Sequence, residues 1–132
     1  MFETDEPILI ISIKCEEPDI VNGNTQDIVM IPFVGTSESR FFSGKILGTG
    51  IDTQKIQKDG EVFLSARYML EGTDFSGQKC RIFIENQGSD MSCCKPTVIT
   101  DSKALSGLET LPLKSVVEPT AEGVTVRIYK EI

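Results

Sequence analysis

Four side chains could do chemistry in a stretch of strand-like runs cut by glycine turns. Asp52 follows the Gly48-Thr49-Gly50 bend, Arg67 and Tyr68 are neighbours in an apolar run, and Asn86 ends the next run. A desolvated carboxylate has a raised pKa and can act as a general acid or base, while a cation stabilises a developing oxyanion. Asp52 and Arg67 are therefore the candidate catalytic pair, and Arg67, Tyr68 and Asn86 are the candidate ligand-binding groups.

Arg67 can be interpreted in two ways. It shares one face of its run with Phe63, Ser65 and Met69. If that face points inward, the guanidinium must be paired, because a lone buried charge is strongly destabilising, and it could then bind a carboxylate, phenolate or enolate. If that face points outward, Arg67 lies in solvent near Glu71 or makes a structural ion pair.

The other candidates also have structural alternatives. The glycines before Asp52 either present its carboxylate at a barrel mouth or make a turn that the carboxylate caps. Tyr68 falls on the face opposite Arg67, so we expect it in the core with its hydroxyl bonded to a partner at the barrel end. Asn86 either satisfies a turn or lines the same mouth as Asp52. The adjacent Cys93 and Cys94 are expected to be surface-loop thiols without a catalytic role.

The chain contains no histidine, which removes the Ser-His and Cys-His nucleophile pairs and histidine-containing zinc sites. Its four cysteines lack the Cys-x-x-Cys spacing of a thiolate site. The Gly48-x-Gly50 pair lacks the third glycine and the Lys-Ser/Thr ending of a phosphate loop. The sequence therefore predicts no metal and no cofactor, and any chemistry must use carboxylate, Lys, Tyr or Arg groups.

The composition of the chain limits the kinds of partner that it can bind. The 132 residues fit one domain, and a net charge of −7 disfavours phosphate backbones, so we expect no nucleic-acid partner. No apolar run approaches the length of a membrane helix, and the acidic N-terminus does not resemble a secretory signal. We therefore expect a cytoplasmic protein that does not bind membranes.

Short runs rich in Ile, Val, Phe and Tyr alternate with Gly, Asn, Asp and Pro clusters, a pattern typical of strands. Residues 1–132 are predicted to be a single all-β domain, an antiparallel β-barrel of about eight strands with at most one short helix, at 100–111. The strands are expected at residues 8–16, 27–34, 40–47, 52–56, 61–71, 79–86 and 123–130. Residues 86–97 are expected to be a loop.

Four segments together resemble the domain of unknown function 3237, also called uncharacterised protein family 0311. They are Gly44-Lys45-Ile46-Leu47-Gly48-Thr49-Gly50-Ile51-Asp52-Thr53-Gln54, Asp59-Gly60, Ala66-Arg67-Tyr68-Met69-Leu70 and Asn86-Gln87-Gly88. The resemblance implies a small antiparallel barrel similar to the lipocalin and allene oxide cyclase barrels. The chain departs from the family pattern in having Thr53 after the aspartate and a shortened segment, 111–114, before the last strand.

Three functions compete. The first, which we prefer, is a barrel that binds a small organic ligand at its polar end. The second is a cofactor-free isomerase, cyclase or lyase that uses Asp52 as base and Arg67 to stabilise an oxyanion. The third is a non-catalytic protein-interaction or homo-oligomer-forming domain whose interior is filled by phenylalanines. Sequence alone does not decide among them, because an error of one residue in register exchanges the inner and outer faces.

Overall fold

The structure, a computed structural model, describes residues 2–92 and 94–132, and these residues form ten strands and one short 3-10 helix. Strands such as β1 and β7 alternate buried apolar residues with more exposed ones, as expected for a sheet with one buried face. The elements are β1 Leu9–Cys15, β2 Asp19–Asn22, β3 Gln26–Glu38, β4 Phe42–Ile46, β5 Gly50–Gln57, β6 Val62–Asp74, β7 Lys79–Gly88, β8 Lys95–Thr100, η1 Ser106–Glu109, β9 Leu113–Pro119 and β10 Gly123–Lys130.

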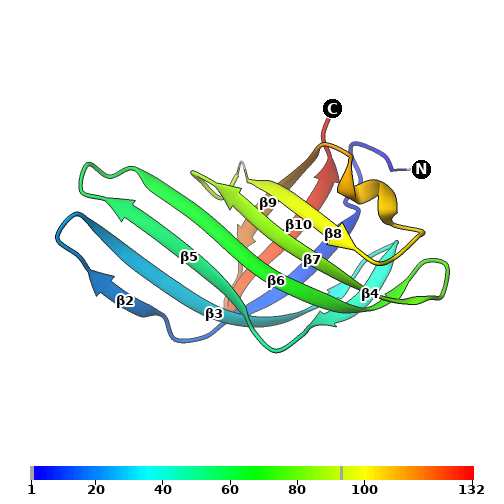
Figure 1. The fold of residues 1–132 in the computed structure, drawn as a ribbon, viewed down its shortest axis with the longest axis horizontal. Helices are drawn as coiled ribbons and strands as arrows, with labels where there is room; N and C mark the ends of the chain where they lie inside the picture. The colour runs from blue at the N-terminus through cyan, green and yellow to red at the C-terminus, as the bar shows by residue number, and fades with distance from the viewer. Residues whose placement is uncertain (1, 93) are drawn as a thin grey trace.

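All of the strand pairs are antiparallel, and the sheet curls into a barrel-like shape (Figure 1). Its strand order is β8-β7-β6-β4-β3-β1-β10-β9, so the first strand and the last strand pair with each other. The two end strands of this order, β8 and β9, come together at a bridge between Cys94 and Ser115. The predicted all-β, barrel-like fold is confirmed.

β4 and β5 occupy one position in the sheet, between β3 and β6. The bend between them contains Gly48, whose φ of 56° is a left-handed conformation that glycine adopts without strain. On the other side of the long β3, β1 and β2 follow one another in the same way. β4 with β5, and β1 with β2, therefore each take the place of one longer strand beside β3.

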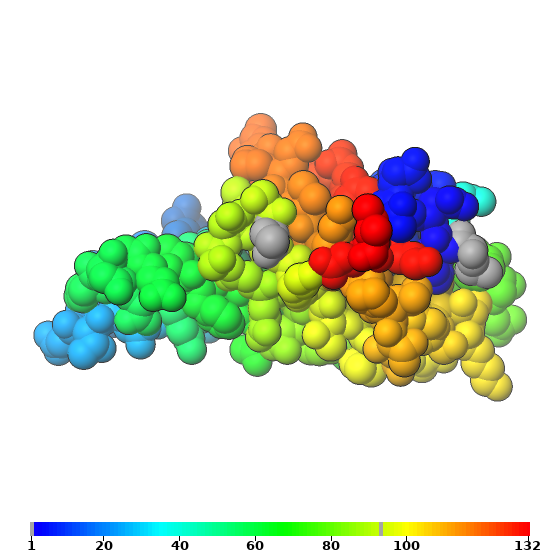
Figure 2. All heavy atoms as spheres, turned by 90° about the horizontal axis from the view of Figure 1, so that it is seen from above, coloured from blue at the N-terminus to red at the C-terminus, as the bar shows by residue number. Residues whose placement is uncertain are grey.

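One side of the sheet is longer than the rest. The halves of β3, β5 and β6 nearest the hairpin turns, together with β2, extend beyond the body of the molecule (Figures 1 and 2). The other end is capped by the N-terminal segment and by η1, whose Leu108 is 2% exposed. The two ends of the barrel-like sheet therefore differ, one being covered and the other having a long projecting wall.

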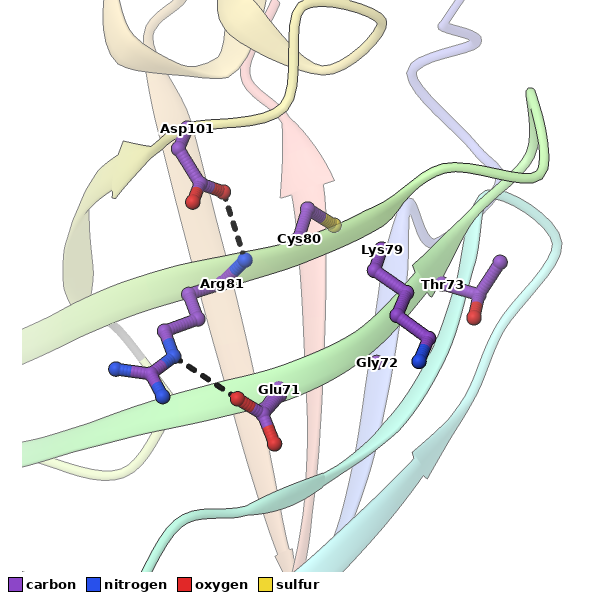
Figure 3. Close-up of a pocket in the computed structure, with 7 residues that line it drawn as sticks. All are labelled: Glu71, Gly72, Thr73, Lys79, Cys80, Arg81 and Asp101. Carbon is purple, nitrogen blue, oxygen red and sulfur yellow. Dashed lines mark hydrogen bonds and ion pairs between the residues drawn. The ribbon is translucent and has the colours of Figure 1, made fainter.

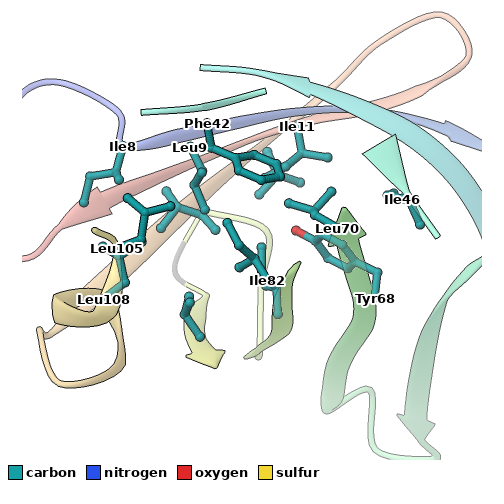
Figure 4. Packing of buried hydrophobic residues seen from close by; sticks show 14 of the residues in the cluster. Ile8, Leu9, Ile11, Phe42, Ile46, Tyr68, Leu70, Ile82, Leu105 and Leu108 are labelled. Carbon is teal, nitrogen blue, oxygen red and sulfur yellow. The ribbon is translucent and has the colours of Figure 1, made fainter. Parts of the chain in front are cut away.

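The hydrophobic core fills the covered half of the interior (Figure 4). Inward residues of β1, β6, β7 and β10 pack against Phe42 and Leu105. The most enclosed side chains include Leu9, Ile11, Phe33, Phe42, Leu70, Ile82, Ile84, Leu105 and Ile128.

Asp74 ties the β6–β7 turn to the loop before η1. Its Oδ1 accepts hydrogen bonds from the backbone and hydroxyl of Ser76 and from the backbone of Gln78, and its Oδ2 accepts one from Ser102 Oγ at 2.7 Å. Hydrogen bonds from Ser76 and Ser102 lower the pKa of Asp74 to about 2. This buried carboxylate is fully used in holding the turn, which makes it a structural group.

The predicted strand runs are present in the structure, with shifted ends, but the sequence prediction missed β2, β8 and β9. The expected loop 86–97 is shorter, because β8 begins at Lys95. The expected helix in 100–111 is reduced to the single turn of η1. No helix among the described residues is long and apolar enough to span a bilayer.

Candidate functional site

A cavity of about 160 Å³ lies inside the sheet where the projecting wall begins. Apolar side chains line most of it, and Asp52, Gln54 and Asn86 provide polar groups. The lining comprises Ile13, Cys15, Ile31, Phe33, Asp52, Gln54, Leu64, Ala66, Tyr68, Asn86, Met91, Cys94, Val117, Val124 and Val126. Three of the four residues singled out from the sequence, Asp52, Tyr68 and Asn86, thus share one cavity.

The register of the sheet explains why Asp52 and Asn86 meet. Asp52 on β5 lies opposite Ala66 on β6, and Ala66 lies opposite Asn86 on β7. Directly opposed residues point to the same face of a sheet, so all three side chains face inward. Two strand spacings separate the Asp52 and Asn86 Cα atoms by about 10 Å. The small Ala66 side chain leaves the space between the two polar groups open.

Asp52 is half-buried, and it does not cap the glycine turn before it. Its recorded hydrogen bond within the described chain is from Gln54 Nε2 to Oδ2, at 3.1 Å. Burial raises the pKa of Asp52, and the Gln54 hydrogen bond opposes that rise without cancelling it. The expectation that Asp52 serves the turn is therefore wrong, and its carboxylate faces the cavity instead.

Other aspartates of the chain accept hydrogen bonds from backbone N–H groups, as a structural carboxylate does. Asp59, Asp90 and Asp101 accept hydrogen bonds from the backbone N–H groups of Glu61, Ser92 and Arg81, respectively. Asp74 does the same within its turn. Asp52 accepts no such backbone bond among the described residues, which distinguishes it from these structural carboxylates.

Asn86 is buried and held in place by Ser115 of β9. Ser115 Oγ donates a hydrogen bond to Asn86 Oδ1 at 2.9 Å. Within the described residues, no hydrogen bond involves the Asn86 amide nitrogen. The nitrogen is also not completely enclosed by other atoms, so a molecule in the cavity could reach it. The amide N–H group is therefore available to donate to a bound molecule.

Tyr68 is 5% exposed and contacts Phe33 edge-on, with ring centroids 5.4 Å apart. Gly50 makes this possible, because a Cβ there would lie 2.4 Å from the Phe33 ring. The Tyr68 hydroxyl points toward the core cluster (Figure 4) and has no hydrogen-bond partner in the described part of the chain. The expected partner at the barrel end is thus missing, and burial raises the pKa of the phenol.

Arg67 lies on the outer face of β6 and is exposed. It sits between Ile51 of β5 and Glu85 of β7, on the face opposite the cavity. The expectation that its guanidinium shares a pocket with Asp52 and Asn86 is wrong, because adjacent residues of a strand point to opposite faces and Tyr68 points inward. Arg67 instead points outward into solvent, which was the other interpretation of the sequence.

Sequence reasoning missed several residues of the cavity. Cys15 lines it, and burial together with the Asp52 charge raises the pKa of this thiol. The alternation of Ile11, Ile13 and Cys15 was the signal that could have placed it inward. Cys94 is buried in the cavity wall, which corrects its expected place on a surface loop, and Cys93 lies outside the described residues. No group of His, Cys, Asp or Glu in the described chain could hold a metal ion.

A larger depression of about 410 Å³ lies beside the turn of the β6–β7 hairpin, away from the interior cavity (Figure 3). It is shallow, and much of its lining is exposed. Three of its four charged residues are already engaged with one another: Arg81 Nε pairs with Glu71 at 2.9 Å, and the Arg81 backbone N–H donates a hydrogen bond to Asp101. The depression therefore offers few unused polar groups, and the smaller interior cavity is the better candidate site.

Comparisons with known proteins agree with the fold. A UPF0311 protein of Clostridium acetobutylicum is 35% identical over 88 residues, which cover 63% of this chain and 52% of that protein. The chain thus spans about half the length of the curated relative that it matches.

Two solved structures share the architecture. A protein with unknown function from C. acetobutylicum has a TM-score of 0.79 and 25% identity, over 95% of this chain and 96% of the other. A beta-barrel-like protein from Acinetobacter baumannii has a TM-score of 0.77 and 19% identity, over 95% and 93% of the two chains. Residues 4–92 match the model of the family described as protein of unknown function (DUF3237), so the chain belongs to that family.

Proposed function

We propose that the protein binds a small, uncharged organic molecule in the cavity between Asp52 and Asn86. The observation that carries the proposal is the composition of the cavity. Its lining is mostly apolar, and its polar groups include Asp52 and Asn86, which lie on either side of Ala66. Ligand sites typically combine an apolar lining with a small number of placed polar groups that orient the ligand.

The cavity volume limits the size of the ligand. An enclosed apolar space of about 150 Å³ is enough to hold benzene, and the cavity here measures about 160 Å³. A single six-membered ring with one or two small substituents therefore matches the enclosed part. A longer substituent would extend past Met91, which is 41% exposed, toward the projecting wall.

The charge of the lining limits the chemistry of the ligand. Asp52 is the one charged side chain in the described lining, and no Lys or Arg accompanies it. A carboxylate or phosphate ligand would lose its hydration and meet a like charge. A neutral ligand can instead present a hydrogen-bond acceptor to the Asn86 amide and a donor to Asp52.

The competing idea of a filled interior receives less support. Phe33, Phe41 and Phe42 are buried, but Phe63 is 44% exposed on the outer face and fills nothing. The remaining space is the cavity itself. The ligand-binding proposal accounts for that space and for the polar groups around it.

The test is a thermal-shift and titration-calorimetry comparison of cyclohexanone, phenol and benzoate. We expect the two neutral rings to raise the melting temperature and benzoate to leave it unchanged. Ala66→Leu should fill the gap between Asp52 and Asn86 and abolish binding, whereas Ser65→Leu, on the outer face of the same strand, should preserve it. Equal binding by the wild type and Ala66→Leu, or no binding of either neutral ring to the wild type, would contradict the proposal.

A further inference from the structure

We propose that the cavity catalyses a cofactor-free proton transfer on a carbonyl compound, with Asp52 as the base and Asn86 as the donor to the carbonyl oxygen. The reaction class is the isomerisation of a β,γ-unsaturated ketone to its conjugated isomer. This inference rests on the proposed ligand site and adds a reaction to it. Asn86, which lines the cavity, takes the oxyanion-stabilising role that the sequence predicted for Arg67, because Arg67 lies on the outer face.

Asp52 has the position and the environment of a base. Gln54 Nε2 bonds to one carboxylate oxygen, Oδ2, and so fixes the orientation of the group. The other oxygen, Oδ1, has no recorded partner among the described residues. A carboxylate partly removed from water is a stronger base than one in solvent, because burial disfavours its charge.

Asn86 has the position of an oxyanion donor. Ser115 holds its oxygen, so the amide nitrogen has a fixed orientation and an unused N–H. Preorganised donors of this kind stabilise the negative charge that develops on a carbonyl oxygen in the transition state. Asn86 is neutral and buried, so it can do this without adding a charge that would need a partner.

Ala66 lies between Asp52 and Asn86 in the sheet, so one ring can fit between the carboxylate and the amide. The carbonyl oxygen would lie against Asn86 and the adjacent carbon against Asp52, with the ring over Ala66. Phe33 and Tyr68 contribute apolar surface to the same cavity, and this surface excludes water from the reacting atoms.

The step balances without another reactant. Asp52 removes a proton from the carbon between the carbonyl and the double bond, breaking that C–H bond. The electron pair forms a dienolate whose oxygen is bonded to the Asn86 amide. The protonated Asp52 then returns the proton to the far carbon of the former double bond, giving the conjugated ketone and the original carboxylate.

The experiment uses 3-cyclohexen-1-one, a single-ring ketone with an acidic C–H group. Conversion to 2-cyclohexen-1-one is followed by ultraviolet absorbance, and deuterium incorporation is followed by NMR in D₂O. Asp52→Asn should lower the rate by about 100-fold or more, and Asn86→Ala should lower it by roughly 100-fold. Glu85→Gln, which alters a neighbouring carboxylate on the outer face of β7, should leave the rate unchanged.

Binding is measured separately by calorimetry, so that the two proposals can fail independently. Binding with a rate that depends on Asp52 and Asn86 supports the inference. Binding without turnover, or with the same rate in Asp52→Asn, overturns the inference and leaves the ligand site standing. Failure of the ketone to bind overturns both.

Discussion

At the scale of single residues, the pKa values of two aspartates are shifted in opposite directions. Asp74 is enclosed but accepts four hydrogen bonds, and these lower its pKa to about 2. Asp52 is half-buried with one recorded hydrogen bond, and burial raises its pKa. Burial disfavours the charge of both carboxylates, and the number of hydrogen-bond donors around each decides whether that effect is outweighed. Asp74 therefore has a structural role, whereas Asp52 has one hydrogen bond among the described residues and faces the cavity.

Asp74 should make the protein sensitive to acid. Its folded-state pKa of about 2 is below the unfolded value of about 3.9. Its stabilising contribution is therefore complete above the unfolded value and is lost as the pH falls toward 2. Urea unfolding of the wild type and Asp74→Asn between pH 2 and pH 6 should show a gap in stability that narrows with acid. Parallel curves would contradict this.

Asp52→Asn should raise the melting temperature at pH 7. Because the folded-state pKa of Asp52 is raised, its ionisation stabilises the unfolded chain more than the folded one. The destabilisation is absent below the unfolded pKa, grows as the pH rises above that value, and is complete above the folded pKa. Melting curves from pH 3 to pH 8 should therefore diverge toward high pH. A lower melting temperature for Asp52→Asn at pH 7 would show that Asp52 has a structural partner.

Tyr68→Phe should leave stability unchanged or increase it. The phenol oxygen is buried without a partner in the described chain, and an unsatisfied buried group costs about 1–3 kcal/mol. Chemical denaturation would measure the change, with Tyr129→Phe, at a half-buried position of β10, as the matched control. A clear loss of stability in Tyr68→Phe alone would indicate a hydrogen bond from this hydroxyl.

Much of this residue-level arrangement could be predicted from the alternation in β6. Val62, Leu64, Ala66, Tyr68 and Leu70 share the inner face, as their pattern predicts, and Arg67 is on the other face. What the pattern does not contain is the choice of which face turns inward and which residues of β5 and β7 lie opposite. That information comes from long-range pairing, and it is what places Asn86, and not Arg67, across from Asp52.

At the scale of elements, two glycines bring β4 and β6 close together. Gly44 and Gly72 are directly opposed in the register of these strands. A Cβ at Gly72 would lie 2.0 Å from the backbone oxygen of Ser43, and one at Gly44 would lie 2.4 Å from that of Glu71. The backbones of β4 and β6 therefore approach each other too closely at this point to accept a side chain.

Gly72→Ala should therefore be destabilising, because the backbone of β4 must move away to accommodate the methyl group. We expect a loss of about 1–3 kcal/mol, the usual cost of overpacking. Gly107→Ala is the matched control, since a Cβ at that position of η1 meets nothing within 4 Å. Denaturant unfolding of both variants tests this, and equal stability of the two would contradict the close approach.

Two of the three strands that the sequence prediction missed, β8 and β9, share a physical feature. β8 begins with Lys95-Pro96, and in β9 apolar residues occupy both faces near Val116 and Val117. Both strands are short, and their strand character depends on pairing with β7 and β10. Local propensity is weak evidence in such segments, because the neighbouring strand supplies most of the stabilisation.

At the scale of the whole molecule, the sheet joins sequence-distant segments into one structure. β1 pairs with β10, and Ser115 of β9 meets Cys94 next to β8 while also holding Asn86 of β7. The cavity draws its lining from β1, β3, β5, β6, β7, β9 and β10, so its shape depends on closure of the whole sheet. The cavity is thus a property of the assembled barrel-like fold.

The chain should therefore unfold in one cooperative transition. Ile11→Ala in β1 and Ile84→Ala in β7 each remove a fully enclosed side chain, from different parts of the wall. Each should cost about 2–5 kcal/mol and should shift two signals equally: the far-ultraviolet circular dichroism of the strands and the near-ultraviolet signal of the tyrosines. If Ile84→Ala moved the tyrosine signal while the strand signal stayed in place, the wall around Tyr68 would be unfolding separately. The cavity would then be a local structure, able to open for a ligand without the rest of the sheet.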